Sequence, residues 1–211
     1  MLMTYTIDKV KSVLLGCAEA VCAEKEQLEH IDSICGDGDL GISMQKGCTA
    51  LIKFSEIFEG EDIGKFFSRC AMEMNRAAPS TMGTLISAGF MQLGKKFAGC
   101  TEIDTQQVMI IPECFAEAIV ARGKAKEGDR TILDALLPLC REFANAAEQK
   151  EALETAIIKG TAAACAGMEK TKELTPKVGR SKWTPENANG VVDEGALLCC
   201  IVAQHLANSE R

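Results

Sequence analysis

The chain has 211 residues, of which 47% are hydrophobic and 25% are charged, and its formal net charge is −7. This length and composition allow one sizeable hydrophobic core. The acidic balance argues against nucleic acid as the main partner, because phosphate-backbone binding requires clustered lysine and arginine side chains.

Apolar residues recur along most of the chain at the spacing of amphipathic helices, as Ile7, Leu14 and Val21 do in the first segment. The alternating runs typical of strands are nearly absent, and the best β-branched pair is Ile110 with Ile111. We therefore predict an all-α fold of about eight helices. The expected helices cover residues 7–28, 44–57, 62–74, 80–97, 104–119, 131–147, 151–170 and 193–207.

The expected connections include an aspartate- and glycine-rich loop at 31–41, a polar loop at 123–130 and a long segment at 171–192. A segment as long as 171–192 inside a compact domain is usually either a functional lid or disordered. We favour the lid, because charged, aromatic and turn residues alternate there, and disorder is the alternative.

Eleven cysteines are many, but nothing else predicts secretion. The N-terminal residues lack a basic region followed by an apolar stretch and a cleavage site, and no window approaches the ~18 apolar residues of a membrane span. Cysteines such as Cys17, Cys70 and Cys140 occupy apolar helical positions, and their spacing does not match zinc sites. We expect reduced core thiols in a cytoplasmic protein without a membrane partner.

The strongest chemical signal is a group of three carboxylates, Asp32, Asp37 and Asp39, with glycines between and after them. Carboxylates that converge in a tight turn repel each other, and a hard divalent cation removes that repulsion. The next helix begins directly afterwards, so its N-terminal N–H groups could face the same anionic ligand. The sequence therefore predicts a magnesium and phosphate site.

Two other interpretations apply to this group. Asp37 and Asp39 could simply cap the following helix and lie in solvent. A calcium-binding EF-hand loop is excluded, because Leu40 stands in a required position and no glutamate follows at the required place.

Three further segments carry weaker signals. Ser80 and Thr81 open a helix after a proline, where they could donate to phosphate or serve as ordinary caps. Residues 122–131 form a charged stretch that could equally be a solvated turn. Arg180 could form a forked pair with phosphate, and Asp193 could be only the cap of the last helix.

These segments, in this order, resemble the nucleotide-binding (L) subunit of bacterial dihydroxyacetone kinases, the DhaL family, over nearly the whole chain. The family stretch I-G-D-x-D-H-G appears here as C-G-D-G-D-L-G over residues 35–41. R-G-K-A-x-x-G-D-K-T-M appears as R-G-K-A-K-E-G-D-R-T-I over 122–132. G-R-A-S-Y followed by D-P-G-A appears as G-R-S-K-W over 179–183 followed by D-E-G-A over 193–196.

The resemblance implies a single DhaL-like nucleotide-binding domain over 1–211, built as a barrel of antiparallel helices with the nucleotide site at one end. It implies that Asp32, Asp37 and Asp39 hold two Mg²⁺ ions that bridge the phosphates of ADP or ATP. The nucleotide-binding residues that it implies are Leu40, Gly41, Ser43, Ser80, Thr81, Gly123, Ile132, Arg180, Asp193 and Gly195.

By this resemblance the chain is a phosphotransferase subunit that acts on an alcohol group of dihydroxyacetone or another small ketose. A separate K-like subunit would hold that substrate, and the phosphoryl donor would be ATP or a phosphocarrier protein of the sugar phosphotransferase system. Two departures stand out: Leu40 replaces the usual histidine, and the loop before Ser80 is about two positions shorter. They motivate the alternative of a nucleotide-binding regulatory protein without transfer activity.

Overall fold

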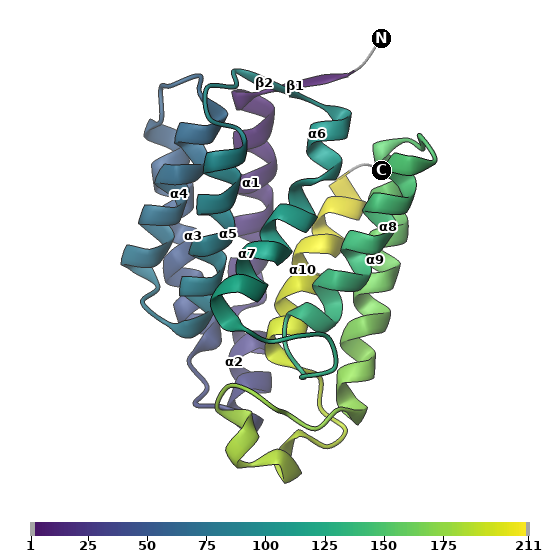
Figure 1. Cartoon of the computed structure of the whole chain (residues 1–211). Coiled ribbons are helices and arrows are strands. Elements are labelled where there is room, and N and C mark those ends of the chain that lie inside the picture. The colour runs from purple at the N-terminus through teal and green to yellow at the C-terminus, as the bar shows by residue number, and fades with distance from the viewer. Residues whose placement is uncertain (1–2, 210–211) are drawn as a thin grey trace.

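The described part of the chain, residues 3–209 of a computed structural model, is helical along most of its length (Figure 1). The helices, in chain order, are α1 (Ile7–Ala23), α2 (Lys25–Cys35), α3 (Leu40–Ile57), α4 (Ile63–Ala77), α5 (Thr81–Lys96), α6 (Thr105–Met109), α7 (Ile111–Gly123), α8 (Leu133–Glu148), α9 (Leu153–Lys170) and α10 (Glu194–Ser209). Two short antiparallel strands, β1 (Thr4–Thr6) and β2 (Glu102–Asp104), pair at the end where the chain begins.

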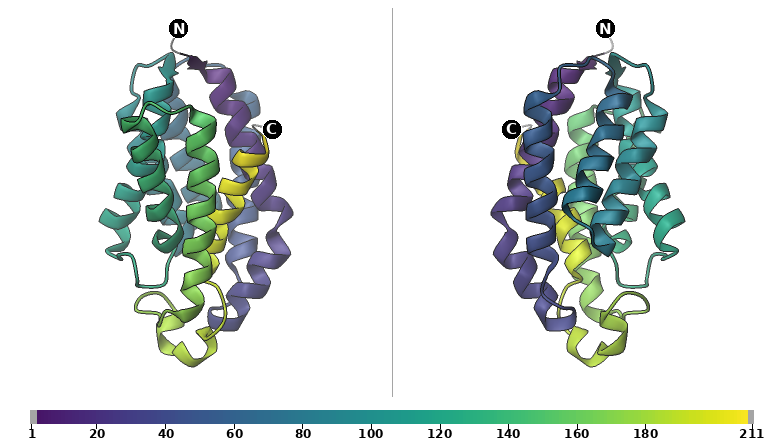
Figure 2. Two further views of the ribbon diagram at one scale, coloured as in Figure 1. Left: turned by 90° about the vertical axis from the view of Figure 1, so that its right-hand side faces the viewer. Right: turned by 90° about the vertical axis from the view of Figure 1, so that its left-hand side faces the viewer.

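Eight of these helices form a closed ring. Contacts run from α1 to α3, α4, α5, α7, α8, α9 and α10 in turn, and α10 packs back against α1. Neighbours in the ring run in opposite directions (Figures 1 and 2). The predicted barrel of about eight antiparallel helices is therefore confirmed, and α2 and α6 are additional shorter segments.

Two expected helix boundaries are wrong. The first expected helix divides at Glu24 into α1 and α2, and α2 continues to Cys35 through residues that we expected to form a loop. Buried Asp32 does not interrupt α2, because the Leu40 N–H satisfies its carboxylate. The helix expected at 104–119 divides at Ile110, since Pro112 in the first turn of α7 cannot continue the hydrogen bonding of α6.

The part of the core between α3 and α4 is built around aromatic side chains. Phe66 is completely buried and packs against Phe54, Phe58 and Phe67 with ring centroids 5.2–5.8 Å apart. These residues come from α3, α4 and the connection between them, so the cluster holds that side of the ring together. Among the described residues, no helix has the length and apolar character that crossing a bilayer requires.

The expectation that every cysteine is a reduced thiol is wrong for one pair. Cys165 on α9 and Cys200 on α10 form a disulfide, with their Cα atoms 5.6 Å apart. The two helices pack against each other, which brings these Cα atoms into the range that a disulfide can span. The other nine cysteines are free thiols, and Cys48, Cys70 and Cys114 are buried as expected.

Replacing Phe66 with alanine tests the importance of the aromatic cluster. We expect Phe66→Ala to lower the free energy of unfolding by about 3–5 kcal/mol, because it leaves a cavity among buried apolar side chains. Urea unfolding measures the change. The control Ile57→Ala, at a side chain that is 76% exposed, should cost less than about 0.5 kcal/mol. Equal losses for the two variants would contradict this account of the core.

Candidate functional site

One end of the ring collects four helix N-termini. Because neighbouring helices alternate in direction, α3, α5, α8 and α10 all begin at the end opposite to β1 and β2 (Figure 1). Each helix start presents unpaired backbone N–H groups and a partial positive charge. This end of the molecule is therefore suited to an anion.

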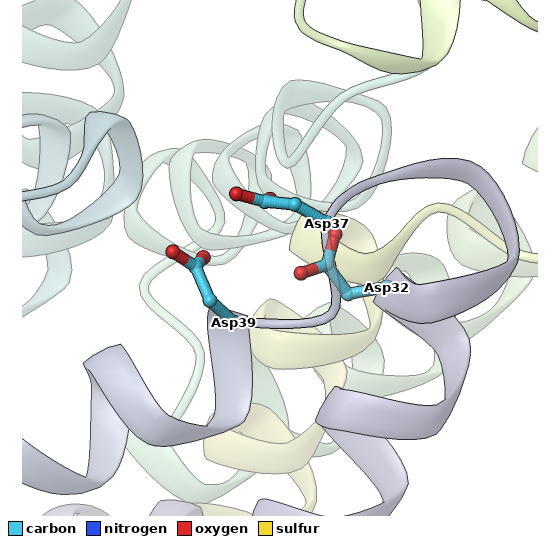
Figure 3. Close-up of side chains that lie close together, drawn as sticks. All are labelled: Asp32, Asp37 and Asp39. Carbon is cyan, nitrogen blue, oxygen red and sulfur yellow. The ribbon is translucent and has the colours of Figure 1, made fainter.

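Three carboxylates converge at the same end. Asp32 comes from the last turn of α2, and Asp37 and Asp39 come from the short turn that joins α2 to α3 (Figure 3). One oxygen from each of the three lies within 4.8 Å of the others. Asp32 is buried, whereas Asp37 and Asp39 are exposed. A cation bound here would have one buried and two solvent-facing ligands.

Asp32 and Asp39 differ in their hydrogen bonds to the start of α3. Asp32 Oδ2 accepts a hydrogen bond from the Leu40 N–H at 3.0 Å, so Asp32 satisfies the first backbone donor of α3. Asp39 stands at the N-cap position of α3, but its side chain accepts no capping hydrogen bond. Capping therefore does not account for Asp39. Burial raises the pKa of Asp32, and the nearby charges of Asp37 and Asp39 raise it further, against the hydrogen bond from Leu40.

Glycines make this turn possible. Gly38 has φ +72°, a left-handed conformation that side chains rarely adopt. A Cβ atom at Gly36 would collide with Asp32 Oδ1, and one at Gly41 would collide with the Lys25 carbonyl oxygen of α2. The glycines thus allow the Asp32 carboxylate to lie beside the turn and allow α3 to start against α2.

The oxygen-only set of Asp32, Asp37 and Asp39 fits a hard cation such as Mg²⁺, which binds one or two carboxylates and completes its shell with water or phosphate oxygens. Mutual repulsion of the three charges favours a cation between them. Among residues 3–209, the positive group in contact with these carboxylates is Arg180, whose Nη1 lies 2.6 Å from Asp37 Oδ2.

Ser80 and Thr81 stand at the start of α5, as expected. The Ser80 hydroxyl oxygen accepts a hydrogen bond from the Gly83 N–H at 3.1 Å, so this residue is an N-cap. Its O–H can still donate to another group. Thr81 is exposed at the first position of the helix. Both positions are therefore compatible with the binding of a phosphate.

The other predicted nucleotide-binding residues fall at the same end but differ in exposure. Leu40 and Gly41 are buried in the first turn of α3, and Ser43 donates its N–H to the Asp39 carbonyl. Gly123 ends α7, and the Ile132 side chain is buried before α8.

Gly195, in the first turn of α10, lies close to Met82 of α5 and to Ile132 before α8. A Cβ atom at Gly195 would lie 2.8 Å from Met82 Cε and 3.1 Å from the Ile132 backbone nitrogen. Asp193 is buried beside it and caps α10, with Oδ2 accepting from the Ala196 N–H at 2.9 Å. The starts of α5, α8 and α10 are therefore in close contact.

The sequence analysis did not predict that two charged residues near the aspartates, Arg130 and Glu194, are buried or partly buried. Arg130 is 1% exposed, and its Nη1 lies 3.9 Å from Asp193 Oδ1. Glu194 Oε2 is buried and has no hydrogen-bond partner among the residues that the structure describes. Burial raises the pKa of both Asp193 and Glu194, and the charge of Asp32 adds to the effect at Glu194. A charged residue after Gly-Asp usually indicates a surface turn, so no sequence signal identified Arg130 as buried.

The family described as the DAK2 domain matches residues 34–208 of this chain. The ADP-binding subunit DhaL of a PEP-dependent dihydroxyacetone kinase 2 from Listeria innocua is 30% identical over 186 residues, which cover 87% of this chain and 86% of that subunit. A D-erythrulose kinase from Mycolicibacterium smegmatis is 30% identical over 193 residues. Those residues cover 90% of this chain but 33% of that kinase, so the chain spans about a third of its length.

The fold is shared with a solved structure. The dihydroxyacetone kinase of C. freundii in complex with AMP-PNP and Mg²⁺ superimposes with a TM-score of 0.74 at 20% identity, over 99% of this chain and 35% of the kinase. The matched family covers the aspartate turn from Cys35 onward, the 122–132 segment and the start of α10. This chain belongs to the DAK2 domain family.

Proposed function

We propose that this chain is the nucleotide-binding subunit of a kinase that phosphorylates dihydroxyacetone or a related small ketose. In this proposal Asp32, Asp37 and Asp39 hold Mg²⁺, two ions by family resemblance, and ADP or ATP binds at the same end of the ring. The whole chain, 1–211, would act as one nucleotide-binding domain.

The observation that carries the proposal is the convergence of three carboxylates within 4.8 Å beside four helix N-termini. A nucleotide diphosphate needs both features, since the cation neutralises the phosphates and the N–H groups bind their oxygens. The names of the relatives agree, because they are kinases or ADP-binding kinase subunits.

Each residue has a distinct task in this proposal. Bound magnesium supplies charge neutralisation of the phosphates during transfer. Ser80 and Thr81 donate hydrogen bonds to phosphate oxygens from the start of α5. Arg180 extends from segment 171–192 toward the same space and offers a planar fork of N–H donors. Leu40, Gly41 and Ser43 form the wall at the start of α3.

Gly123, Ile132, Asp193 and Gly195 would shape the nucleotide pocket from α7, α8 and α10. The close contact of Gly195 with Met82 and Ile132 leaves little room for substitution on this side. We expect these residues to determine the shape of the pocket, because Ile132 and Asp193 are buried.

The proposal requires partners. Several relatives are named as subunits of PEP-dependent kinases, which supports a K-like subunit that holds the ketose and a phosphocarrier protein as one possible donor. ATP is the other donor. We further propose that the chain works in the cytoplasm, without a nucleic-acid or membrane partner.

One observation favours a second candidate function, that of a nucleotide-binding regulatory protein without transfer activity. Leu40 is buried at the position where the family resemblance places a histidine, and its side chain offers no hydrogen bond to phosphate. Binding and transfer must therefore be measured separately.

Replacing Asp37 with asparagine tests the cation site. For the wild type, ADP with Mg²⁺ at a hundred times its Kd should raise Tm by roughly 5–10 °C, because binding stabilises only the folded state. Asp37→Asn should remove most of that rise. Differential scanning fluorimetry measures both.

The matched control is Asp8→Asn, an exposed acidic residue in the first turn of α1 at the opposite end. It should behave like the wild type. A magnesium-dependent shift that persists in the Asp37 variant would refute the metal assignment.

Reconstitution tests transfer. The purified chain, a K-like subunit and dihydroxyacetone should form the phosphorylated ketose when MgATP or a phosphocarrier with phosphoenolpyruvate is present. Phosphorus NMR detects the product, and Asp37→Asn should lower the rate by at least about 100-fold because charge neutralisation at the phosphates is lost. Tight magnesium-dependent nucleotide binding without product, under either donor, would favour the regulatory function.

A further inference from the structure

Segment 171–192, which we call the lid, lies across the end of the ring that is opposite to β1 and β2 (Figure 1). Hydrogen bonds hold its first and last residues together. The Asp193 N–H donates to buried Thr171 Oγ1 at 2.8 Å, and the Gly190 N–H donates to the Lys172 carbonyl at 3.1 Å. The segment contains three short 3₁₀ turns, Thr171–Glu173, Ser181–Trp183 and Pro185–Ala188. The segment therefore has a defined conformation, and its function as a lid stays a prediction.

The polar loop of residues 124–132 contacts the lid near both of its ends. Near the beginning of the lid, Lys177 Nζ donates to the Gly128 carbonyl at 3.0 Å and lies 3.4 Å from Asp129 Oδ1. At the other end, Arg130 Nη2 donates to the carbonyls of Val191 and Val192 at 3.1 and 3.2 Å. One loop thus fixes the lid at two points.

Arg130 is an unusual residue for a polar loop. It is 1% exposed and has φ +61°, a left-handed conformation that is uncommon for a residue with a side chain. Its Nε and Nη1 atoms are buried and have no hydrogen-bond partner in the described part of the chain, although Nη1 lies 3.9 Å from Asp193 Oδ1. Burying a partly unpaired guanidinium and holding a strained backbone both destabilise the fold. Such a cost indicates a role other than general stability.

The position of Arg130 suggests that role. Its Nη2 also lies 3.9 Å from Cys35 Sγ, at the end of the helix that carries Asp32. The guanidinium therefore connects the last residues of the lid with the end of α2. Arg180 in the lid reaches Asp37, but that ion pair is largely exposed and contributes little by itself to lid placement. The buried contacts of Arg130 are the stronger restraint.

We propose that Arg130 is a positioning residue which, together with Lys177, clamps the lid onto loop 124–132 and so places Arg180 above the aspartates. The functional meaning of this clamp rests on the proposed role of the aspartates in binding a cation and phosphate. The clamp itself can be tested without any ligand, by measuring the motion of the lid.

The chain contains a built-in probe of the lid. Its single tryptophan, Trp183, lies in the lid three residues after Arg180 and is 77% exposed. Tryptophan fluorescence of this chain therefore comes from the lid, and its anisotropy falls when the lid becomes more mobile while the tumbling of the whole molecule stays the same. Trypsin offers a second probe, because Lys177, Arg180 and Lys182 are cleavage points within the lid.

The test replaces Arg130 with methionine, which retains much of the side-chain length but cannot donate. We expect the Trp183 anisotropy to fall and tryptic cleavage in the lid to accelerate by about tenfold or more, as two charge-assisted hydrogen bonds are lost. The Kd for ADP with Mg²⁺ should rise by a similar factor. Arg130→Lys, which can still donate to a carbonyl, should recover part of each change.

The control Arg69→Met removes an exposed arginine of α4 that stacks over Phe54. It should leave the anisotropy and the lid cleavage rate unchanged. If Arg130→Met does not fold, Lys177→Met tests the same clamp at an exposed position. This variant loses the cleavage point at 177, so cleavage is compared at Arg180 and Lys182, where we expect an acceleration of roughly two- to fivefold.

Wild-type anisotropy and cleavage rates in the folded variants would overturn the clamp. A mobile lid with an unchanged Kd for ADP and Mg²⁺ would overturn its link to the site. Absence of any nucleotide binding by the wild type would instead refute the proposed function, while the anisotropy and cleavage experiments would still decide whether the clamp exists.

Discussion

The alternation of helix direction around a closed ring is the constraint on which the site depends. Each connection reverses the chain, so every second helix begins at the same end, and closure of α10 onto α1 arranges those starts around one axis. Aligned helix N-termini carry partial positive charge and unpaired N–H groups. An end of the molecule that is suited to an anion therefore follows from the topology, before any particular side chain is considered.

The same end also concentrates negative side chains. Asp32, Asp193 and Glu194 are all at least partly buried there, and Arg130 is the buried cation among them. Burial raises the pKa of each of these three carboxyl groups, and the charges of neighbouring carboxylates raise it further. The carboxylates at this end would bind a divalent cation, and the helix N-termini would bind phosphate oxygens. The cation and the phosphates would then neutralise each other's charge.

The lid adds a part that the ring alone lacks. It begins after α9 and returns to α10, so both of its ends are anchored in the ring while its middle spans the site end. Exposed ion pairs such as Arg180 with Asp37 are weak, and buried contacts such as those of Arg130 hold their geometry better. We infer that the buried contacts of Arg130 fix the position of the lid, and that the exposed middle of the lid brings Arg180 to Asp37.

Local sequence determined most of the helical segments and the position of the carboxylate cluster. Apolar periodicity identified the ring helices, and the close spacing of Asp32, Asp37 and Asp39 with glycines predicted a carboxylate cluster, because both are properties of neighbouring residues. Only the tertiary structure decided that α2 continues through buried Asp32, that Cys165 meets Cys200, and that Arg130 lies inside. Those outcomes depend on which helix packs beside which, and partners distant in the sequence leave no periodic signal in it.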